Sequence, residues 1–137
     1  MNFKPAQIPS NDTKRVEAVH RSGATEDIDS NLYEIYCFLA KEITGCPVSW
    51  TGVIDSEKQV ILARDGFPED VPKEMPRNQT LCQFALEKKQ PLIINNMVKD
   101  ARFKYHPAVT DFGVKFYAAF PIVTSDGYTL GTLCVSD

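Results

Sequence analysis

The end of the chain, residues 114–137, constrains the fold more than any other stretch. It reads as two strands joined by a tight turn at Ser125-Asp126-Gly127, because Asp and Gly tolerate positive φ and Asp can bond its own backbone. The residues before the turn are apolar on both faces, which is typical of a strand covered on both sides. We therefore expect a hairpin near the middle of a sheet. Its ladder should be irregular at Pro121, which has no N–H to donate, and Gly131 should leave room for a close neighbour.

The totals fit an ordinary single domain. The chain has 137 residues, enough for one domain with a real core. Its net charge of −3 gives no general attraction to nucleic acid, and no apolar run approaches the length of about 20 residues that a membrane span needs. The N-terminus holds no apolar signal core, so a cytoplasmic location is the default expectation. The four cysteines, Cys37, Cys46, Cys82 and Cys134, have no zinc-binding spacing, so no metal site is expected.

Two helices are expected in the first third of the chain. Residues 1–10 contain two prolines and read as a flexible lead-in. A short basic helix follows over residues 13–22, ending at Gly23, and its charged side chains should face solvent. The stronger helix covers residues 29–44, and its apolar side chains recur at steps of three and four: Ile28, Leu32, Ile35, Tyr36, Leu39 and Ile43. This stripe predicts a helix that covers a sheet, or one that also packs against a second partner such as the same helix in a dimer.

The middle of the chain alternates strands with loops. Residues 48–54 and 59–64 predict a hairpin, and Thr80 with Gln83 forms a capping box that predicts a helix to about Lys89. Residues 92–94 read as a short buried strand. The stretch 95–114 is long and irregular, which is typical of a functional loop or lid. The element order indicates an α+β domain with one central antiparallel sheet, helices on one face and a loop-and-helix cap on the other.

Several segments together resemble the GAF domain found at the N-terminus of bacterial sensor and signal-transduction proteins. The most specific are residues 116–121, 126–127 and 130–137, with support from residues 81–85, 100–103 and 106–109. The resemblance implies a central antiparallel sheet of about five or six strands. It also implies a small-molecule pocket roofed by the segment between the strands at 92–94 and 116–124. Residues 11–137 then form the GAF domain without the C-terminal helix that usually follows the last strand.

The resemblance also implies a role in signalling. Such domains bind a small molecule, or relay a signal through dimerisation, for an output domain such as a kinase or a cyclase, which would lie outside this chain. A pocket between sheet and cap would be lined by aromatic rings with polar handles: Trp50, Phe84, Phe103, His106, Phe116, Tyr117 and Phe120. The same rings could instead fill the core. Neither histidine has the neighbouring cysteine of a bilin-binding member, and the cyclic-nucleotide signature is absent, so the ligand and any cofactor stay unassigned.

Two alternatives to a sensory domain stay open. One is a thiol-dependent enzyme of the free methionine sulfoxide reductase type, for which Cys82 and Cys134 are the available pair. A helix N-terminus would lower the pKa of Cys82, whereas apolar neighbours would raise it. The characteristic cysteine spacing of that enzyme is missing and no other catalytic constellation is visible, so we expect a non-enzymatic domain. The other alternative is an interaction module with a filled core and no ligand.

Overall fold

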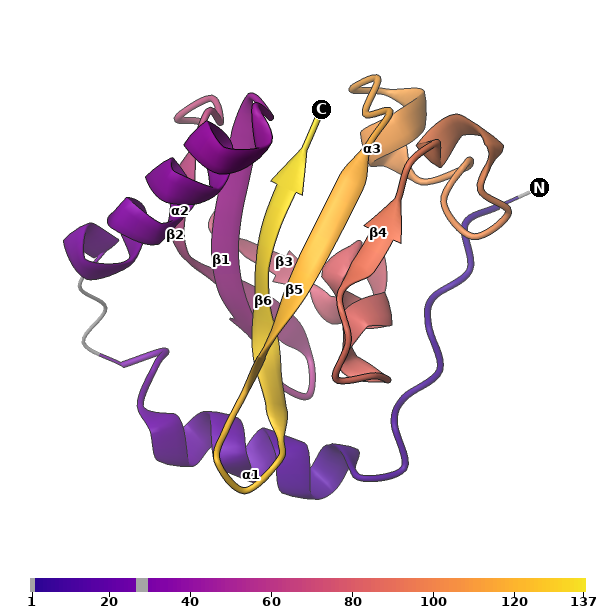
Figure 1. The fold of residues 1–137 in the computed structure, drawn as a ribbon. Coiled ribbons are helices and arrows are strands. Elements are labelled where there is room, and N and C mark those ends of the chain that lie inside the picture. Colours follow the sequence, from indigo (N-terminus) through magenta and orange to yellow (C-terminus); the bar gives the residue numbers. More distant parts are fainter. Residues whose placement is uncertain (1, 27–29) are drawn as a thin grey trace.

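A six-stranded antiparallel sheet forms the centre of the molecule. The computed structural model describes residues 2–26 and 30–137, and within them the strand order is β3-β2-β1-β6-β5-β4 (Figure 1). The strands are β1 (Val48–Ile54), β2 (Lys58–Asp65), β3 (Glu74–Pro76), β4 (Leu92–Ile94), β5 (Tyr117–Val123) and β6 (Thr129–Ser136). Each neighbouring pair is antiparallel. The α+β fold expected from the sequence is therefore confirmed.

Helices and a cap occupy opposite faces of this sheet (Figure 1). Helix α2 (Ser30–Thr44) packs on β1, β2 and β6, and α1 (Asp12–Ser22) lies across the end of the β5–β6 hairpin. The other face is covered by short segments: η1 (Arg77–Gln79), η2 (Cys82–Leu86), η3 (Met97–Lys99) and α3 (Pro107–Thr110). These segments and the loops around them, residues 77–91 and 95–115, are called the cap below.

The C-terminal hairpin lies in the sheet as predicted, with β6 between β1 and β5. Gly131 on β6 faces β1 so closely that a Cβ atom there would lie 2.7 Å from the Cα atom of Val53 and even nearer the carbonyl oxygen of Gly52. The close approach expected at Gly131 is confirmed. The ladder is irregular between Ile122 and Val123, whereas Pro121 keeps its regular place. The prediction of an irregularity at Pro121 was therefore wrong by one residue.

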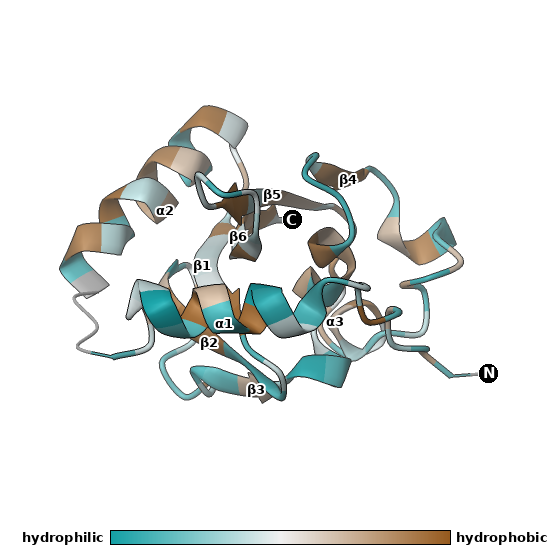
Figure 2. Ribbon diagram, turned by 90° about the horizontal axis from the view of Figure 1, so that it is seen from below, coloured by the Kyte–Doolittle hydropathy of each residue, from teal (hydrophilic) through white to brown (hydrophobic). Residues whose placement is uncertain are grey.

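Helix α2 buries a different face from the one that its apolar stripe predicts. Its inner face is Cys37, fully buried, with the half-buried Tyr33 and Ala40. The described members of the apolar stripe instead point outward, and Figure 2 shows brown positions recurring along α2 at the edge of the molecule. Small residues at positions 37 and 40 let the helix approach the strands closely, which leaves the bulky stripe without room on that side. Ile28 and the expected helix start at 29 lie outside the described residues.

Two other expected elements differ from the structure. The predicted helix from Thr80 to Lys89 is only the 3-10 segment η2. The Gln83 N–H donates to Thr80 Oγ1 at 3.2 Å, as a capping box requires. However, the Gln83 side chain donates to the Thr80 carbonyl and accepts from the N–H of Ala6 at 2.9 Å, so it does not close the box. Strand β4 lies at the edge of the sheet, and its Ile93 is exposed, so the prediction of a buried strand was wrong there.

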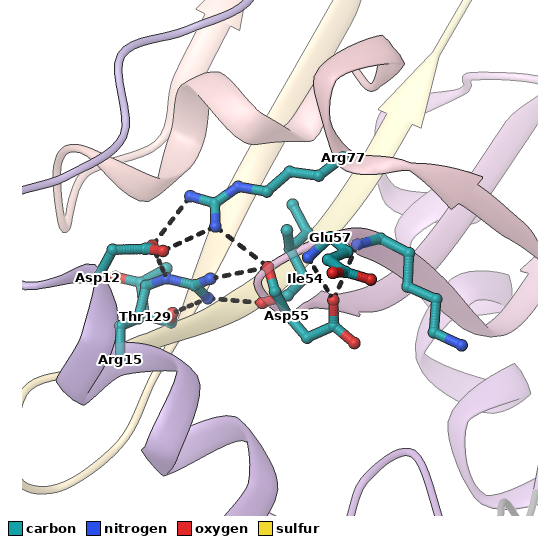
Figure 3. Close-up of polar contacts among 8 residues, drawn as sticks. Asp12, Arg15, Ile54, Asp55, Glu57, Arg77 and Thr129 are labelled. Carbon is teal, nitrogen blue, oxygen red and sulfur yellow. Dashed lines mark hydrogen bonds and ion pairs between the residues drawn. The ribbon is translucent and has the colours of Figure 1, made fainter.

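Arg15 of α1 is buried rather than solvated, as Figure 3 shows. Its side chain is 1% exposed, and its guanidinium donates to three carbonyl oxygens at 2.7, 3.1 and 3.3 Å, those of Ile54, Thr129 and Asp55. Arg15 thus supplies donors to carbonyl oxygens at the ends of β1 and β6, and the Asp55 carbonyl also accepts from Arg77 at 3.1 Å. The expectation that the charged side chains of this helix face solvent was wrong for Arg15.

Asp12 joins this arginine to a second one from the cap. One carboxylate oxygen accepts from Arg15 Nε at 2.8 Å, and the other accepts from Arg77 of η1 at 2.8 Å. Burial works to raise the pKa of Asp12, but the hydrogen bonds from Arg77 and Arg15 outweigh it and lower the pKa. The network therefore ties the first helix, the end of the sheet and the cap together (Figure 3).

Candidate functional site

The aromatic part of the predicted site begins on the cap side of the sheet. Trp50 on β1, Cys134 on β6 and Ala119 on β5 are neighbours across three strands. Tyr117, two residues before Ala119, points the same way and is fully buried, with its ring centroid 5.9 Å from that of Trp50. Phe103 of the cap packs on Tyr117 at 6.4 Å. The prediction that Trp50, Phe103 and Tyr117 lie close together is confirmed.

The row of rings continues from the core to the surface. Phe103 contacts Phe84 at 4.8 Å, Phe84 contacts Phe3 at 5.9 Å, and Phe3 contacts His106 at 4.7 Å between ring centroids. Phe3, from the predicted lead-in, is the residue that sequence reasoning missed. A single aromatic side chain in a stretch of polar and proline residues was the available signal. The space in which the sequence placed a pocket is filled by these rings and by the buried Met97.

Phe116 and Phe120 lie on the opposite side of the sheet. Phe116 packs against the cluster of Cys46, Ala118 and Val135, on the side that α2 covers. Phe120 is partly exposed on the same side. Alternation along β5 requires this, because Tyr117 faces the cap and its neighbours at even positions must face away. The seven predicted residues therefore do not form one site.

His106 is buried and has a structural role in the cap. Its Nδ1 accepts from the N–H of Ala108 at 3.0 Å, which caps α3, and its Nε2 lies 2.7 Å from the carbonyl oxygen of Gln79. These two partners require the neutral ring with the proton on Nε2. Burial lowers the pKa of His106, and the Gln79 carbonyl only partly offsets this. His106 contacts the ring of Phe3, which in turn contacts Phe84 of the predicted aromatic group.

Two thiols and two hydroxyl groups meet beneath the aromatic rings. Cys82 of η2 and Cys134 of β6 have their sulfur atoms 3.3 Å apart, and both are buried. The Tyr117 hydroxyl donates to Cys82 Sγ at 3.1 Å and lies 3.4 Å from Cys134 Sγ. Thr132 Oγ1 lies 2.9 Å from Cys134 Sγ. This cluster contains the two thiols of the site, both of them buried and free of a disulfide.

The two thiols differ in acidity. Burial works to raise the pKa of Cys82, but hydrogen bonds from its four polar neighbours, Cys134, Thr132, Tyr117 and Trp50, outweigh burial and lower the pKa to about 7. Burial and the neighbouring Cys82 thiolate raise the pKa of Cys134 well above its usual value. Cys82 is therefore the thiol that ionises first, with Cys134 as one of its hydrogen-bond donors.

An open cleft lies between the N-terminal segment and the cap. Its volume is about 910 Å³, and its walls include Lys4, Pro5, Phe84, Glu87, Arg102 and Tyr105. The cations outnumber the acids around it, since Lys104 also lines the cleft. Arg102 is held by Asp100 at 3.2 Å. This cleft, rather than the filled space under the cap, is the concave surface near the predicted site.

The outer face of α2 is the second candidate site. Six large apolar side chains are exposed there, from 45% for Leu39 to 82% for Ile43, and the others are Leu32, Ile35, Tyr36 and Phe38. On this face of the sheet, α2 packs on strands β1, β2 and β6. Strands β4 and β5 extend beyond the helix, and their side chains Ile93, Phe120 and Ile122 are also partly exposed on this face. Exposed apolar surface of this extent is typical of an interaction site.

Neither a membrane span nor a metal centre is found in the part of the chain that the structure describes. None of its helices has the length and apolar character needed to cross a membrane. No three His, Cys, Asp or Glu side chains within the same residues come close enough together to hold a metal ion.

With this geometry in place, the chain was compared with known proteins. The family model described as "GAF domain" matches residues 29–137. This chain belongs to the GAF domain family. The match includes the sheet, α2 and the whole cap, and so confirms the family expected from residues 116–137.

The individual relatives share only low sequence identity with this chain. A curated relative, "Cyclic di-GMP phosphodiesterase PA2567" of Pseudomonas aeruginosa, is 27% identical over 94% of this chain, which spans only 22% of that protein. Among solved structures, the GAF domain of a Coxiella burnetii phosphoenolpyruvate-protein phosphotransferase is 14% identical, with a TM-score of 0.63 over 93% of this chain and 77% of that one. A type II free methionine-R-sulfoxide reductase of Thermoplasma acidophilum is 15% identical, with a TM-score of 0.61 over 90% and 77%. Both structures share the fold.

Proposed function

We propose that this GAF domain is a regulatory module that relays a signal by pairing its α2 with α2 of a second copy. The observation that carries the proposal is the exposed apolar stripe of that helix. Leu32, Tyr36, Leu39 and Ile43 follow one another at steps of four, three and four, the spacing of a helix–helix seam. A two-fold axis brings identical faces together, so an apolar stripe along one helix is its own complement.

The output domain of this proposal lies outside the chain. The curated relative supports it, because the matching part is about a fifth of a protein named as a phosphodiesterase. We infer a kinase, a cyclase or a phosphodiesterase as the output, in a bacterial cytoplasm. With a net charge of −3, the domain has no general electrostatic attraction to nucleic acid. A change in how two α2 helices pack would reach the output domain as a change in the geometry of the dimer.

Measurement of the oligomeric state tests this proposal. We expect a dimer by native mass spectrometry and by sedimentation velocity, and a monomer for Tyr36→Glu, which places a charge in the seam. Ser56→Glu, in the exposed turn between β1 and β2, introduces the same charge elsewhere and should leave the dimer intact. A wild-type protein that stays monomeric at about 100 μM, a concentration at which micromolar contacts are populated, rejects the proposal.

A second candidate function is small-molecule binding in the cleft. Its open volume, its aromatic wall at Phe84 and its surplus of cations favour an anionic ligand with an apolar part. Native mass spectrometry of freshly purified protein would detect such a ligand as added mass. Arg102→Gln should remove that mass, whereas Lys115→Gln, outside the cleft, should keep it. A protein that carries no added mass under any purification condition would leave the relay as its function.

Thiol-dependent reduction of methionine sulfoxide is the remaining candidate, favoured by the 3.3 Å contact between Cys82 and Cys134. That reaction requires the substrate to touch the attacking sulfur, yet Cys82 is 2% exposed and covered by the cap. We therefore expect no turnover of free methionine sulfoxide with dithiothreitol as reductant. Turnover that disappears in Cys82→Ser would make the protein an enzyme and would contradict this expectation.

A further inference from the structure

We infer that Cys82 and Cys134 are a redox modification site, a dithiol that a small hydroperoxide converts to a disulfide joining the cap to β6. The sulfur atoms already lie 3.3 Å apart. A disulfide bond is about 2.05 Å long, so its closure requires an approach of little more than 1 Å. This inference is independent of the relay and of the cleft, since it uses neither α2 nor the N-terminal segment.

The polar neighbours prepare the two sulfurs for different roles. Tyr117 donates a hydrogen bond to Cys82 Sγ at 3.1 Å, which favours the thiolate form of that residue. Cys134 lies in the central strand β6, where Thr132 Oγ1 holds it at 2.9 Å. Cys82 is therefore the attacking sulfur, and Cys134 is the resolving one. The lower pKa of Cys82 agrees with this assignment.

The reaction proceeds in two balanced steps. The Cys82 thiolate attacks the terminal oxygen of a hydroperoxide, so that an S–O bond forms and the O–O bond breaks. The alkoxide that leaves takes up the proton released by the Cys82 thiol and becomes an alcohol, or water when the oxidant is hydrogen peroxide. Cys134 then attacks the Cys82 sulfur, an S–S bond forms, and the hydroxyl group leaves with the Cys134 proton as water. Two thiols lose two electrons and the peroxide gains them.

Burial selects the oxidant. Cys82 is 2% exposed and Cys134 is 0% exposed, beneath the rings of Trp50 and Tyr117. A protein disulfide or oxidised glutathione cannot bring its sulfur into contact with either residue without removing the cap. Hydrogen peroxide is close to the size of water and needs only local opening of the cap. The product would tie η2 covalently to the sheet, because its two cysteines come from the cap and from the central strand.

Mass analysis of the wild-type protein provides the direct test. After a hydrogen peroxide pulse, denaturation and N-ethylmaleimide, we expect two fewer maleimide groups per chain than in the untreated protein. Proteolysis should give a peptide pair joined at residues 82 and 134, which dithiothreitol separates. Cys37 and Cys46, on the other side of the sheet, should stay labelled and act as internal controls. Protein treated in urea should show no preference for the 82–134 pair.

Two variants test the assigned roles. Cys134→Ser should stop at the sulfenic acid, which dimedone traps on Cys82, and should give no cross-link. Tyr117→Phe should slow oxidation about tenfold, the effect of losing one hydrogen bond to a charged sulfur. Two results overturn the inference: all four cysteines remain free after excess peroxide, or Cys82 is converted to sulfinic acid while Cys134 stays labelled. The wild-type experiment shows whether the 82–134 disulfide forms, even where a variant fails to fold.

Discussion

At the scale of single residues, Arg15 should contribute more to stability than any exposed charge of α1. Arg15→Met removes the side-chain donor from the buried carbonyl oxygens of Ile54 and Thr129, whereas the Asp55 carbonyl and Asp12 lose one of their donors and keep Arg77. We expect the free energy of unfolding in urea to fall by about 2–4 kcal/mol, since buried groups lose partners that nothing replaces. Lys14→Met, on the exposed side of the same helix, is the control and should change stability by less than about 0.5 kcal/mol. Equal effects of the two variants would contradict this role.

His106 should make the fold sensitive to mild acid. Burial lowers the pKa of His106 below its ordinary 6.5 in the folded state. Between the folded pKa and 6.5 the unfolded chain binds more protons, so stability is fully present above that range and is lost as the pH falls through it. Protonation of Nδ1 also removes the acceptor for the Ala108 N–H. The melting temperature should therefore fall from about pH 7.5 to about pH 5.5, the range in which histidine titrates.

The control variants separate His106 from other groups that titrate. His106→Asn keeps an acceptor for the Ala108 N–H but cannot take up a proton, so its melting temperature should vary less with pH than that of the wild type. His20→Asn, at an exposed position, should follow the wild type. The lowered pKa values of Asp12 and Asp100 act only below their ordinary 3.8, outside this window. Cys82, whose pKa is lowered to about 7, also loses stabilisation at the upper end of the window, and this contribution is common to the wild type and His106→Asn. A wild type with no loss of stability in the window would contradict the assignment.

Both residues show what sequence patterns do and do not reveal about a side chain. Arg15 is a charged residue among polar neighbours, so the sequence predicted solvent exposure for it, whereas the family resemblance implied a ligand contact for His106. Their partners in distant segments are backbone carbonyls, those of Ile54 and Thr129 for Arg15 and that of Gln79 for His106. Such contacts depend on how the chain folds in space, and no local periodicity encodes them.

At the scale of elements, the β1–β6 pairing depends on the absence of a side chain at Gly131. In Gly131→Ala the new Cβ would meet backbone atoms of Gly52 and Val53, which cannot move as a flexible side chain could. We expect a loss of stability of about 3 kcal/mol or more in urea unfolding. Gly23→Ala is a useful comparison, because Gly23 ends α1 at φ +67° in open space and should cost only about 1 kcal/mol. Similar losses in both variants would argue against the close approach.

Helices and strands were predicted correctly where the sequence pattern also indicated which segment they pair with or pack against. The hairpins over residues 48–65 and 117–136 follow from alternation and turn chemistry, and they hold. The stripe of α2 was visible in the sequence, but periodicity says which residues share a face and not what covers that face. The small residues Cys37 and Ala40 let the opposite face of α2 approach the strands, so the apolar stripe faces outward. The helix predicted after Thr80 is only a 3-10 segment, and the Gln83 side chain that would close its capping box instead accepts from the N–H of Ala6.

At the scale of the whole molecule, the family resemblance correctly predicted the sheet and its α+β fold, but not how the side chains pack beneath the cap. Trp50, Phe103 and Tyr117 were placed correctly near one another because three separate segments of the family pattern converge there. That these rings and Met97 pack together in one core cluster, and that Phe3 extends the row, depends on side-chain volumes summed over the fold. The proximity of Cys82 and Cys134 follows from the same convergence of η2 on β6.

If α2 pairs with a second copy, the stability of the whole domain depends on its concentration. Folding is then coupled to association, and each tenfold increase in protein concentration adds about 1.4 kcal/mol per dimer. For two chains of 137 residues the melting temperature should rise by about 2 °C per tenfold increase. Scanning calorimetry between about 5 and 500 μM covers a range in which such dimers dissociate. Tyr36→Glu should melt at one temperature throughout, and a wild type that does the same would show that the exposed face of α2 stays unpaired.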